Sequence, residues 1–161
     1  MRCCATTLAI AVSGAVAFQL CVWFLPFPDA LRSVKPNSTW ITDRNGVALA
    51  ACVAVDGQWR LLLEEDQTSP HLLRAIVAIE DERFFEHQGV DWKSVMGSAW
   101  ENFSALRTRR GASTITMQLV RLRMPGPRSL GNKLMQAIRA RQLEQRFAKQ
   151  QILIDYVNEA P

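Results

Sequence analysis

The chain has 161 residues, of which 48% are hydrophobic, and a formal net charge of +4. This length allows one domain with a substantial core and excludes two domains of ordinary size. Mean hydropathy is only −0.02 although nearly half of the residues are apolar, so the apolar residues must be unevenly distributed along the chain.

The N-terminal segment, residues 3–28, carries no charged side chain. In a helix, at about 1.5 Å per residue, it is long enough to cross the ~30 Å hydrocarbon core of a membrane. A cleaved signal peptide needs a shorter apolar region with small residues at its exit, and a lipoprotein needs a small residue where Leu20 precedes Cys21. We therefore expect an uncleaved transmembrane signal-anchor over 3–28, with Trp23 and Phe24 near the outer interface and the remainder outside the cytoplasm.

A polar linker is predicted over residues 29–41, followed by a short β segment over 42–68. The turn dipeptides Asn45-Gly46 and Asp56-Gly57 separate short β-like runs, which predicts a small hairpin of two or three strands. Cys52 stands alone outside the apolar segment, so no disulfide framework exists, and we expect it to be a small buried hydrophobe.

From Ser69 onward the pattern is helical, with Ser69 as N-cap and Pro70 as the first helical residue. Further helices are predicted over residues 93–105, 114–122 and 129–157, which makes the chain mainly α. Glu80 lies one turn beyond the apolar face of the first of these helices. That face consists of Leu72, Leu73, Ile76 and Val77.

Charge is segregated along the chain. Residues 62–91 contain eight acidic and two basic side chains, whereas residues 107–149 contain eleven Lys or Arg and one acid, Glu144. A basic segment of this kind attracts an anionic partner. Nucleic acid is disfavoured beyond a membrane anchor, so a phosphate-bearing lipid or the membrane surface is the expected partner.

The stretch "AIEDERFFEHQGVD", residues 78–91, places acidic side chains beside aromatic rings. A glutamate such as Glu80 on an apolar helix face is a candidate for a raised pKa and for general acid–base work. The alternative is a helix end with solvated carboxylates. His87 has no second histidine at metal-ligand spacing, so we predict a structural hydrogen-bonding role and no zinc site.

The stretch "RRGASTITMQL", residues 109–119, combines a glycine with hydroxyl side chains at the predicted start of a helix. Exposed amide groups at a helix start favour an anionic group, and an ordinary N-cap is the alternative. Basic side chains follow closely and favour a phosphate site. They are Arg121, Arg123, Arg128 and Lys133.

Order and spacing of three segments resemble the bacterial peptidoglycan glycosyltransferases, glycosyltransferase family 51. The opening motif of that family, Glu-Asp-x-x-Phe-x-x-His-x-Gly, matches Glu80, Asp81, Phe84, His87 and Gly89. The second motif resembles "GASTITMQL", residues 111–119, and the third resembles residues 128–158. The resemblance implies a lysozyme-like, mainly α glycosyltransferase domain, of which residues 69–161 would be the N-terminal, incomplete part.

This resemblance implies polymerisation of lipid II into glycan strands with release of undecaprenyl pyrophosphate, at the outer face of the bacterial inner membrane. Glu80 matches the general base, and Asp81 the paired acid, as an orienting residue. The resemblance assigns no certain cofactor, although some members of the family use Mg²⁺ or Mn²⁺, which suits pyrophosphate chemistry. Expected partners are lipid II, the growing glycan, the membrane and other cell wall synthesis proteins. Further positions that match substrate-cleft residues are Phe84, His87, Ser113, Thr114, Gln118, Arg121, Arg128, Lys133 and Gln136.

Departures from the family pattern qualify these roles. A second cleft glutamate of the family is Gln136 here, which cannot ionise, while Ala112 replaces a glycine and Met117 a glutamine. The family continues beyond the position of Pro161, so the sequence predicts a shortened domain. Three functions therefore remain open: a lipid II polymerase, a lipid II-binding module without turnover, and a remnant of a disrupted gene. A lysozyme-like hydrolase is a weaker alternative, since hydrolysis does not need the basic segment.

Overall fold

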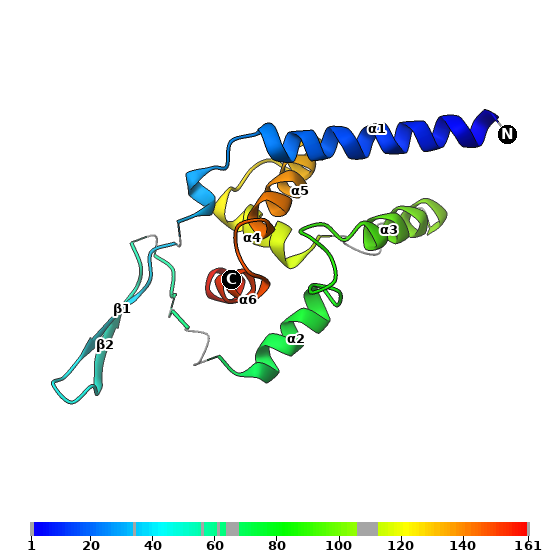
Figure 1. Ribbon diagram of the computed structural model, residues 1–161. Coiled ribbons are helices and arrows are strands. Elements are labelled where there is room, and N and C mark those ends of the chain that lie inside the picture. Colours follow the sequence, from blue (N-terminus) through cyan, green and yellow to red (C-terminus); the bar gives the residue numbers. More distant parts are fainter. Residues whose placement is uncertain are drawn as a thin grey trace.

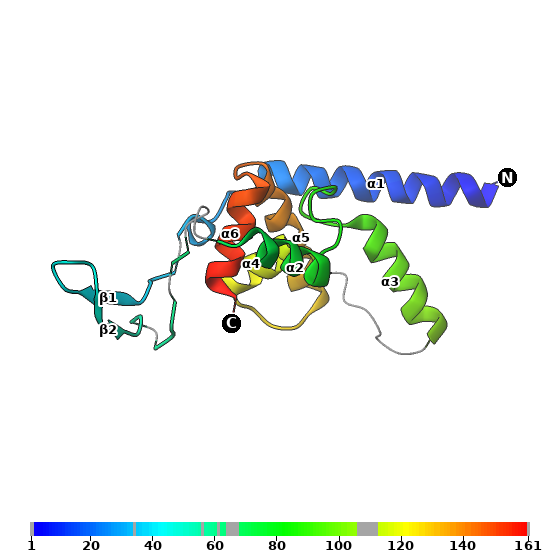
Figure 2. The same cartoon turned by 90° about the horizontal axis from the view of Figure 1, so that it is seen from below.

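The computed structural model describes residues 2–33, 35–55, 57–60, 62–63, 68–105 and 113–160. Figure 1 shows a helical body around α4 (Ile115–Arg123), α5 (Leu130–Glu144) and α6 (Lys149–Glu159). A two-stranded hairpin extends away from this body in both Figure 1 and Figure 2. The described chain is thus mainly helical with one small sheet, as the sequence predicts.

The predicted membrane segment forms a long helix, α1 (Arg2–Phe24). Across the parts of the chain that the structure describes, however, no helix combines the length and apolar character needed to cross a membrane, so the predicted span is not supported. The last turns of α1 are instead held by the domain. Val22 is buried, and the Gln142 side-chain amide donates to the backbone carbonyls of Val22 and Leu25 at 2.9 and 2.7 Å.

The hairpin consists of β1 (Thr39–Thr42) and β2 (Ala48–Cys52), which pair antiparallel. Gly46 adopts φ +82°, the left-handed conformation that the predicted Asn45-Gly46 turn requires. The Asp43 carboxylate accepts from the amides of Asn45 and Val47, and these two hydrogen bonds lower the pKa of Asp43. Strand β1 begins inside the stretch predicted as linker.

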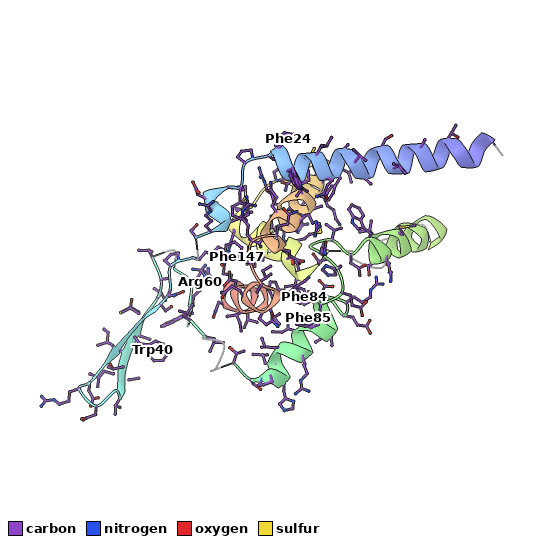
Figure 3. All side chains as sticks on the ribbon, in the orientation of Figure 1. Phe24, Trp40, Arg60, Phe84, Phe85 and Phe147 are labelled. Carbon is purple, nitrogen blue, oxygen red and sulfur yellow. The ribbon has the colours of Figure 1, made fainter. Side chains whose placement is uncertain are left out.

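Both faces of the hairpin remain open to solvent, so Cys52 is exposed and the prediction that it would be a buried hydrophobe is wrong. The reason is that no described helix covers this sheet. Trp40 on the hairpin stands apart from the helical body in Figure 3, whereas Phe84 and Phe147 lie among the helices. Asp56 of the second predicted turn lies outside the described residues.

Two helices connect the hairpin to the body. In α2 (Pro70–Glu80), Ser69 caps the N-terminus by accepting from the amide of His71, as predicted. Leu73, Ile76 and Val77 of this helix are partly buried against the core, but no residue of α2 is fully buried. The predicted helix over 93–105 is α3 (Trp92–Ala105).

The long helix predicted over 129–157 is wrong, because the chain breaks between α5 and α6. Neither Pro nor Gly marks the break; the amides of Arg146 and Phe147 turn back to the carbonyl of Leu143, and Ala148 is extended. Because of the break, α5 and α6 both contact α4. Their buried residues include Leu143 and Ile152, within one core.

The core brings together residues from the loop after α2 and from helices α4 to α6. Its centre is α4, where five of nine residues are buried. Consequently, the segments of the first, second and third motifs meet around one helix. The fully or nearly fully buried members from these segments are Phe84, Val90, Ile115, Met117, Leu119, Val120, Ala137, Ala140, Leu143, Ile152, Leu153 and Tyr156.

Candidate active site

Glu80, the predicted catalytic carboxylate, is the last residue of α2 and is exposed. The expectation that it would lie on an apolar, desolvated face is wrong, because the helix ends there and the chain turns at Asp81 with φ −162° and ψ 74°. The alternative that we kept open, a solvated carboxylate at a helix end, describes its surroundings. Exposure makes the carboxylate accessible to a large substrate.

Gln118 of α4 holds this carboxylate in place. Its side-chain Nε2 donates to Oε2 of Glu80 at 2.8 Å. The hydroxyl of Tyr156 on α6 donates to Oε1 of the same Gln118 side chain at 3.2 Å. Three side chains from α2, α4 and α6 thus form one hydrogen-bonded series, and Tyr156 is a member that the sequence reasoning missed.

Arg121 lies on the same side of α4, one turn after Gln118, and is exposed. Burial raises the pKa of Tyr156, the Glu80 carboxylate raises it further, and the Arg121 guanidinium opposes the shift. The pKa of Tyr156 therefore depends on the charges of both Glu80 and Arg121. We call Glu80, Gln118 and Arg121 the exposed edge.

Other predicted substrate residues are not in hydrogen-bond contact with the exposed edge. Arg128 and Lys133 are exposed around the start of α5, and Gln136 is half-buried in the same helix. Ser113 is half-buried just before α4. Within the described ranges, no hydrogen bond or ion pair joins these four side chains to Glu80.

Asp81 has surroundings opposite to those of its neighbour Glu80. It is buried, its Oδ2 accepts from the Ile115 amide at 3.0 Å, and the same oxygen lies 2.9 Å from Nε2 of His87. The predicted anion site at the start of α4 therefore receives a protein carboxylate rather than a phosphate. This geometry agrees with an orienting role for Asp81, because it fastens the first motif to the second.

Phe84 and His87, which match substrate-cleft residues of the family, lie beside Asp81. Phe84 is fully buried, its ring centroid is 6.2 Å from that of His87, and the Lys149 ammonium lies 4.2 Å from its centre. Burial lowers the pKa of Lys149, while hydrogen bonding and attraction to Glu144 oppose the shift. The Nζ atom of Lys149 lies 2.8 Å from Glu144, which also accepts from the Thr116 hydroxyl.

Gly89 explains the last position of the first motif. It adopts φ +86°, and a Cβ atom there would lie 2.7 Å from the carbonyl carbon of Ala140 and from the amide nitrogen of Arg141. The Thr114 hydroxyl donates to the Gly89 carbonyl at 2.7 Å and accepts from the amide of Met117 as the N-cap of α4. Thr114 is thus a structural cap; Gly111 and Ala112 lie outside the described residues.

Arg123 was read as part of the basic segment but is a buried structural cation. Its guanidinium lies 2.7 Å from Asp155 Oδ2, 2.6 Å from Glu159 Oε1 and 2.8 Å from the Leu31 carbonyl. Burial disfavours its charge, but the two carboxylates outweigh burial and raise the pKa of Arg123. It joins α4 to α6 and is not available to a ligand.

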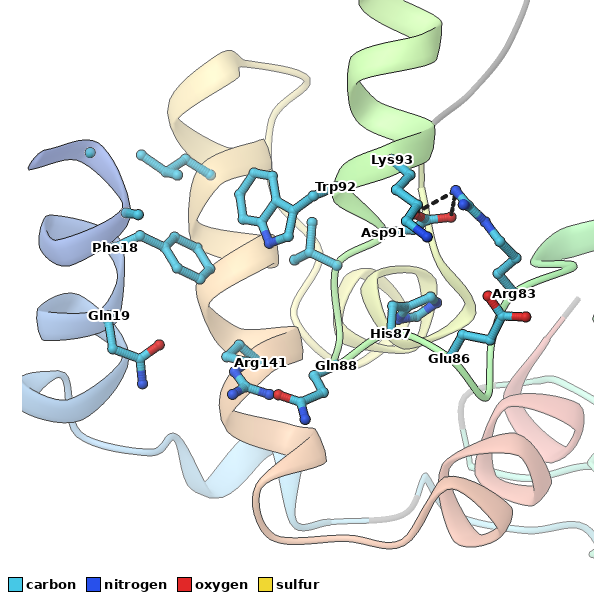
Figure 4. Close-up of a pocket in the computed structure, with 14 residues that line it drawn as sticks. Phe18, Gln19, Arg83, Glu86, His87, Gln88, Asp91, Trp92, Lys93 and Arg141 are labelled. Carbon is cyan, nitrogen blue, oxygen red and sulfur yellow. Dashed lines mark hydrogen bonds and ion pairs between the residues drawn. The ribbon is translucent and has the colours of Figure 1, made fainter. Parts of the chain in front are cut away.

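A pocket of about 870 Å³ lies between α1, the loop after α2 and α5. Figure 4 shows Phe18 and Trp92 on one side and Arg141 beside Gln88 on another. The pocket combines apolar walls with both basic and acidic side chains, as an amphipathic ligand would require. Glu80 is not among its lining residues, so pocket and exposed edge are separate features.

Arg83 and Asp91 close one end of this pocket, with Arg83 Nη2 2.6 Å from Asp91 Oδ2 (Figure 4). Burial disfavours the charged form of Asp91, but hydrogen bonds from Ser94 and the Arg83 cation prevail and lower its pKa to about 2. Asp91 also accepts from the amide of Ser94, so it caps the start of α3.

The described residues do not fit a protein-held divalent cation. No group of three or more His, Cys, Asp or Glu side chains converges anywhere in the described ranges. Asp81 is already engaged by His87 and the Ile115 amide, and Glu80 by Gln118. No catalytic step is therefore assigned to a metal ion.

Comparison with known proteins bears on this arrangement. A family model described as "Transglycosylase" matches residues 45–161. Penicillin-binding protein 1C of Escherichia coli (strain K12) is 37% identical over 140 residues, 87% of this chain and 18% of that protein. Penicillin-binding protein 1A of Streptococcus oralis is 32% identical over 155 residues, 94% of this chain and 24% of that protein.

Penicillin-binding protein 1A/1B of Bacillus subtilis (strain 168) is 32% identical over 148 residues, 91% of this chain and 16% of that protein. The chain thus spans less than a quarter of the length of each of these relatives. The predicted resemblance to the peptidoglycan glycosyltransferases of glycosyltransferase family 51 is confirmed. The chain belongs to the transglycosylase family.

Proposed function

We propose that this chain acts in peptidoglycan glycosyl transfer, polymerising lipid II into glycan strands with release of undecaprenyl pyrophosphate. The observation that supports this most directly is the 2.8 Å hydrogen bond from Gln118 to Glu80. It joins the first and second motifs of the transglycosylase family at an accessible carboxylate. The related proteins named above agree with the assignment at the level of the family.

In this mechanism Glu80 is the general base. One carboxylate oxygen, Oε2, is held by Gln118, and the other is directed to the 4-hydroxyl of the acceptor sugar. The acceptor oxygen attacks the anomeric carbon of the donor, its proton passes to Glu80, and the bond from that carbon to the pyrophosphate breaks with inversion. One carboxylate suffices, because pyrophosphate leaves as an anion and needs cations rather than a proton.

Arg121 is a cation that can stabilise negative charge near Glu80, because it is exposed and lies one turn after Gln118 on the same side of α4. Arg128 and Lys133 are exposed and supply further positive charge before and within α5. Gln136 contributes no charge, so recognition of the donor at that position relies on hydrogen bonding.

The amphipathic nature of a lipid-linked sugar also agrees with the surface of the chain. Apolar side chains of α1 at helical spacing are exposed, and the 870 Å³ pocket has both apolar and charged lining residues. These features support action at the outer surface of the bacterial inner membrane, where such a substrate resides. The exposed apolar residues of α1 are Val12, Val16, Leu20, Trp23 and Phe24.

The test is polymerisation of labelled lipid II by the wild type, Glu80→Gln and the matched control Glu82→Gln. Glu82 is an exposed carboxylate two positions away, so both variants lose one surface charge. Loss of a general base lowers the rate by about 10²- to 10⁴-fold. We expect this loss for Glu80→Gln and wild-type product for Glu82→Gln.

Equal product from the two variants would contradict the assignment of the base. A parallel binding measurement with lipid II separates the alternatives. Binding by the wild type without any polymer would favour a lipid II-binding module without turnover, and the absence of both would remove the proposed function.

A further inference from the structure

Tyr156 lies inside the core of the helical body and yet reaches the exposed edge. Its side chain is only 7% exposed, and its ring packs within the core cluster. Its hydroxyl donates to Gln118 Oε1 at 3.2 Å, and Gln118 Nε2 in turn donates to Glu80 Oε2 at 2.8 Å. A residue held rigidly by packing is thereby connected to a carboxylate that packing does not hold.

The order of donors and acceptors gives this series a direction. A glutamine amide has one acceptor end and one donor end, and the two ends can exchange by rotation. Because the phenol donates to Oε1, the Nε2 end of Gln118 must face Glu80. The Glu80 carboxylate also favours the Nε2 end, because the oxygen end of the amide repels it. Without the phenol, that one contact alone orients the Gln118 amide, and the Oε1 end loses its donor.

Electrostatics keep the phenol in its donor form. Burial raises the pKa of Tyr156, and the negative charge of Glu80 adds to the shift. The hydroxyl therefore stays protonated at neutral pH and remains a donor. In the described part of the chain, Oε1 of Glu80 has no hydrogen-bond partner, which leaves that oxygen open to a proton from the substrate.

We propose that Tyr156 is a positioning residue for Glu80, setting the orientation of the Gln118 amide so that one carboxylate oxygen is held and the other faces the acceptor hydroxyl. This inference rests on the proposed function for its catalytic meaning, since it assigns a purpose to the arrangement of the base. The structural link itself does not depend on turnover.

The link is tested first by spectroscopy, because Tyr156 is the one tyrosine of the sequence. Near-ultraviolet absorbance of tyrosinate during a pH titration therefore reports this residue alone. We expect Glu80→Gln to lower the pKa of Tyr156 relative to the wild type, and Glu82→Gln to leave it unchanged. The same pKa in all three proteins would overturn the proposed link, whether or not the chain polymerises lipid II.

The positioning role is tested next by kinetics of Tyr156→Phe, which keeps the buried ring and removes only the hydroxyl. Losing one neutral hydrogen bond predicts a fall in kcat of about 3- to 10-fold with KM unchanged. Circular dichroism and the unfolding midpoint establish that the variant is folded. A folded Tyr156→Phe protein with wild-type kcat would overturn the positioning role.

The two tests also separate this inference from the proposed function. If the wild type makes no glycan while Glu80→Gln still shifts the pKa of Tyr156, the proposed function fails and the positioning role fails with it, although the structural link stands. If the wild type is active and neither variant differs as expected, the positioning role fails and the function stands.

Discussion

Neighbouring charges on two helices of this chain have opposite surroundings. At the end of α2, Glu80 is exposed, whereas Asp81 is buried against His87 and the start of α4. On α4, Arg121 is exposed, whereas the side chain of Arg123 is only 2% exposed and lies between two carboxylates of α6.

The difference shows how one short segment serves both stability and chemistry. A buried charge is costly unless it is paired, so Asp81 and Arg123 are committed to fixed partners. An exposed charge costs little to leave unpaired, so Arg121 and the Oε1 oxygen of Glu80 remain accessible to a ligand. The buried member of each pair fixes the backbone from which the exposed member projects.

The largest loss in the free energy of unfolding is expected for Arg123→Met. Arg121→Met on the same helix is the matched control. Removing the buried guanidinium leaves Asp155 and Glu159 without their partner, which predicts a loss of about 3–5 kcal/mol in the free energy of unfolding. Arg121→Met should change that free energy by less than about 0.5 kcal/mol. Denaturant unfolding measures both, and similar values for the two variants would remove the distinction between them.

The next largest loss of stability is expected for Gly89→Ala. The left-handed φ and the 2.7 Å approach to the backbone of Ala140 predict a loss of about 2–4 kcal/mol. Gly97→Ala is the matched control, because it lies within α3 with no atom within 4 Å of its new methyl group, and it should stabilise by up to about 1 kcal/mol. Thermal unfolding that ranks the two in the opposite order would contradict the packing of this loop on α5.

At the end of α2, the stabilities of Asp81→Ala and Glu80→Gln compare the buried with the exposed carboxylate. It leaves the buried amide of Ile115 and the imidazole of His87 without their acceptor, so we expect a loss of about 1–3 kcal/mol. Glu80→Gln keeps a hydrogen-bonding side chain at an exposed position and should leave the free energy of unfolding within about 0.5 kcal/mol of the wild type. Urea titration of both variants checks this, and a large loss for Glu80→Gln would show that its role is structural.

The smallest expected effect is the contribution of Asp91 to the free energy of unfolding at acidic pH. Its folded-state pKa of about 2 lies below the ordinary value of 3.8, so the folded state binds this proton less readily than the unfolded state does. Its contribution of about 1–2 kcal/mol is complete above pH 3.8 and is lost as the pH falls toward 2. The difference in stability between wild type and Asp91→Asn should therefore shrink over this range. A constant difference would contradict the pairing with Arg83.

Local features of the fold were accessible from sequence because their causes are local. Ser69 followed by Pro70 starts α2, and Asn45-Gly46 makes the turn of the hairpin, since each depends on residues within one turn. The family resemblance assigned Glu80 and Gln118 to two motifs of one cleft, and in the structure their side chains are hydrogen-bonded.

Other features depend on residues far apart in the chain and could not be predicted. The break between α5 and α6 carries no Pro or Gly and is explained by the packing of both helices on α4. In the sequence, Arg123 is indistinguishable from its exposed neighbour Arg121, because the carboxylates that identify it as a buried cation, Asp155 and Glu159, are distant along the chain. Tyr156 offered no signal beyond an apolar stripe, and its contact with Gln118 appears only in three dimensions.

The most direct test of the division between neighbouring charges is the rate of glycan formation per folded molecule in Glu80→Gln and Asp81→Asn. The account predicts that Glu80→Gln is as stable as the wild type but loses about 10²- to 10⁴-fold in rate. Asp81→Asn should be less stable, while its folded molecules retain more activity than those of Glu80→Gln. Glycan formation at the wild-type rate by Glu80→Gln, or wild-type stability of Asp81→Asn, would contradict the account.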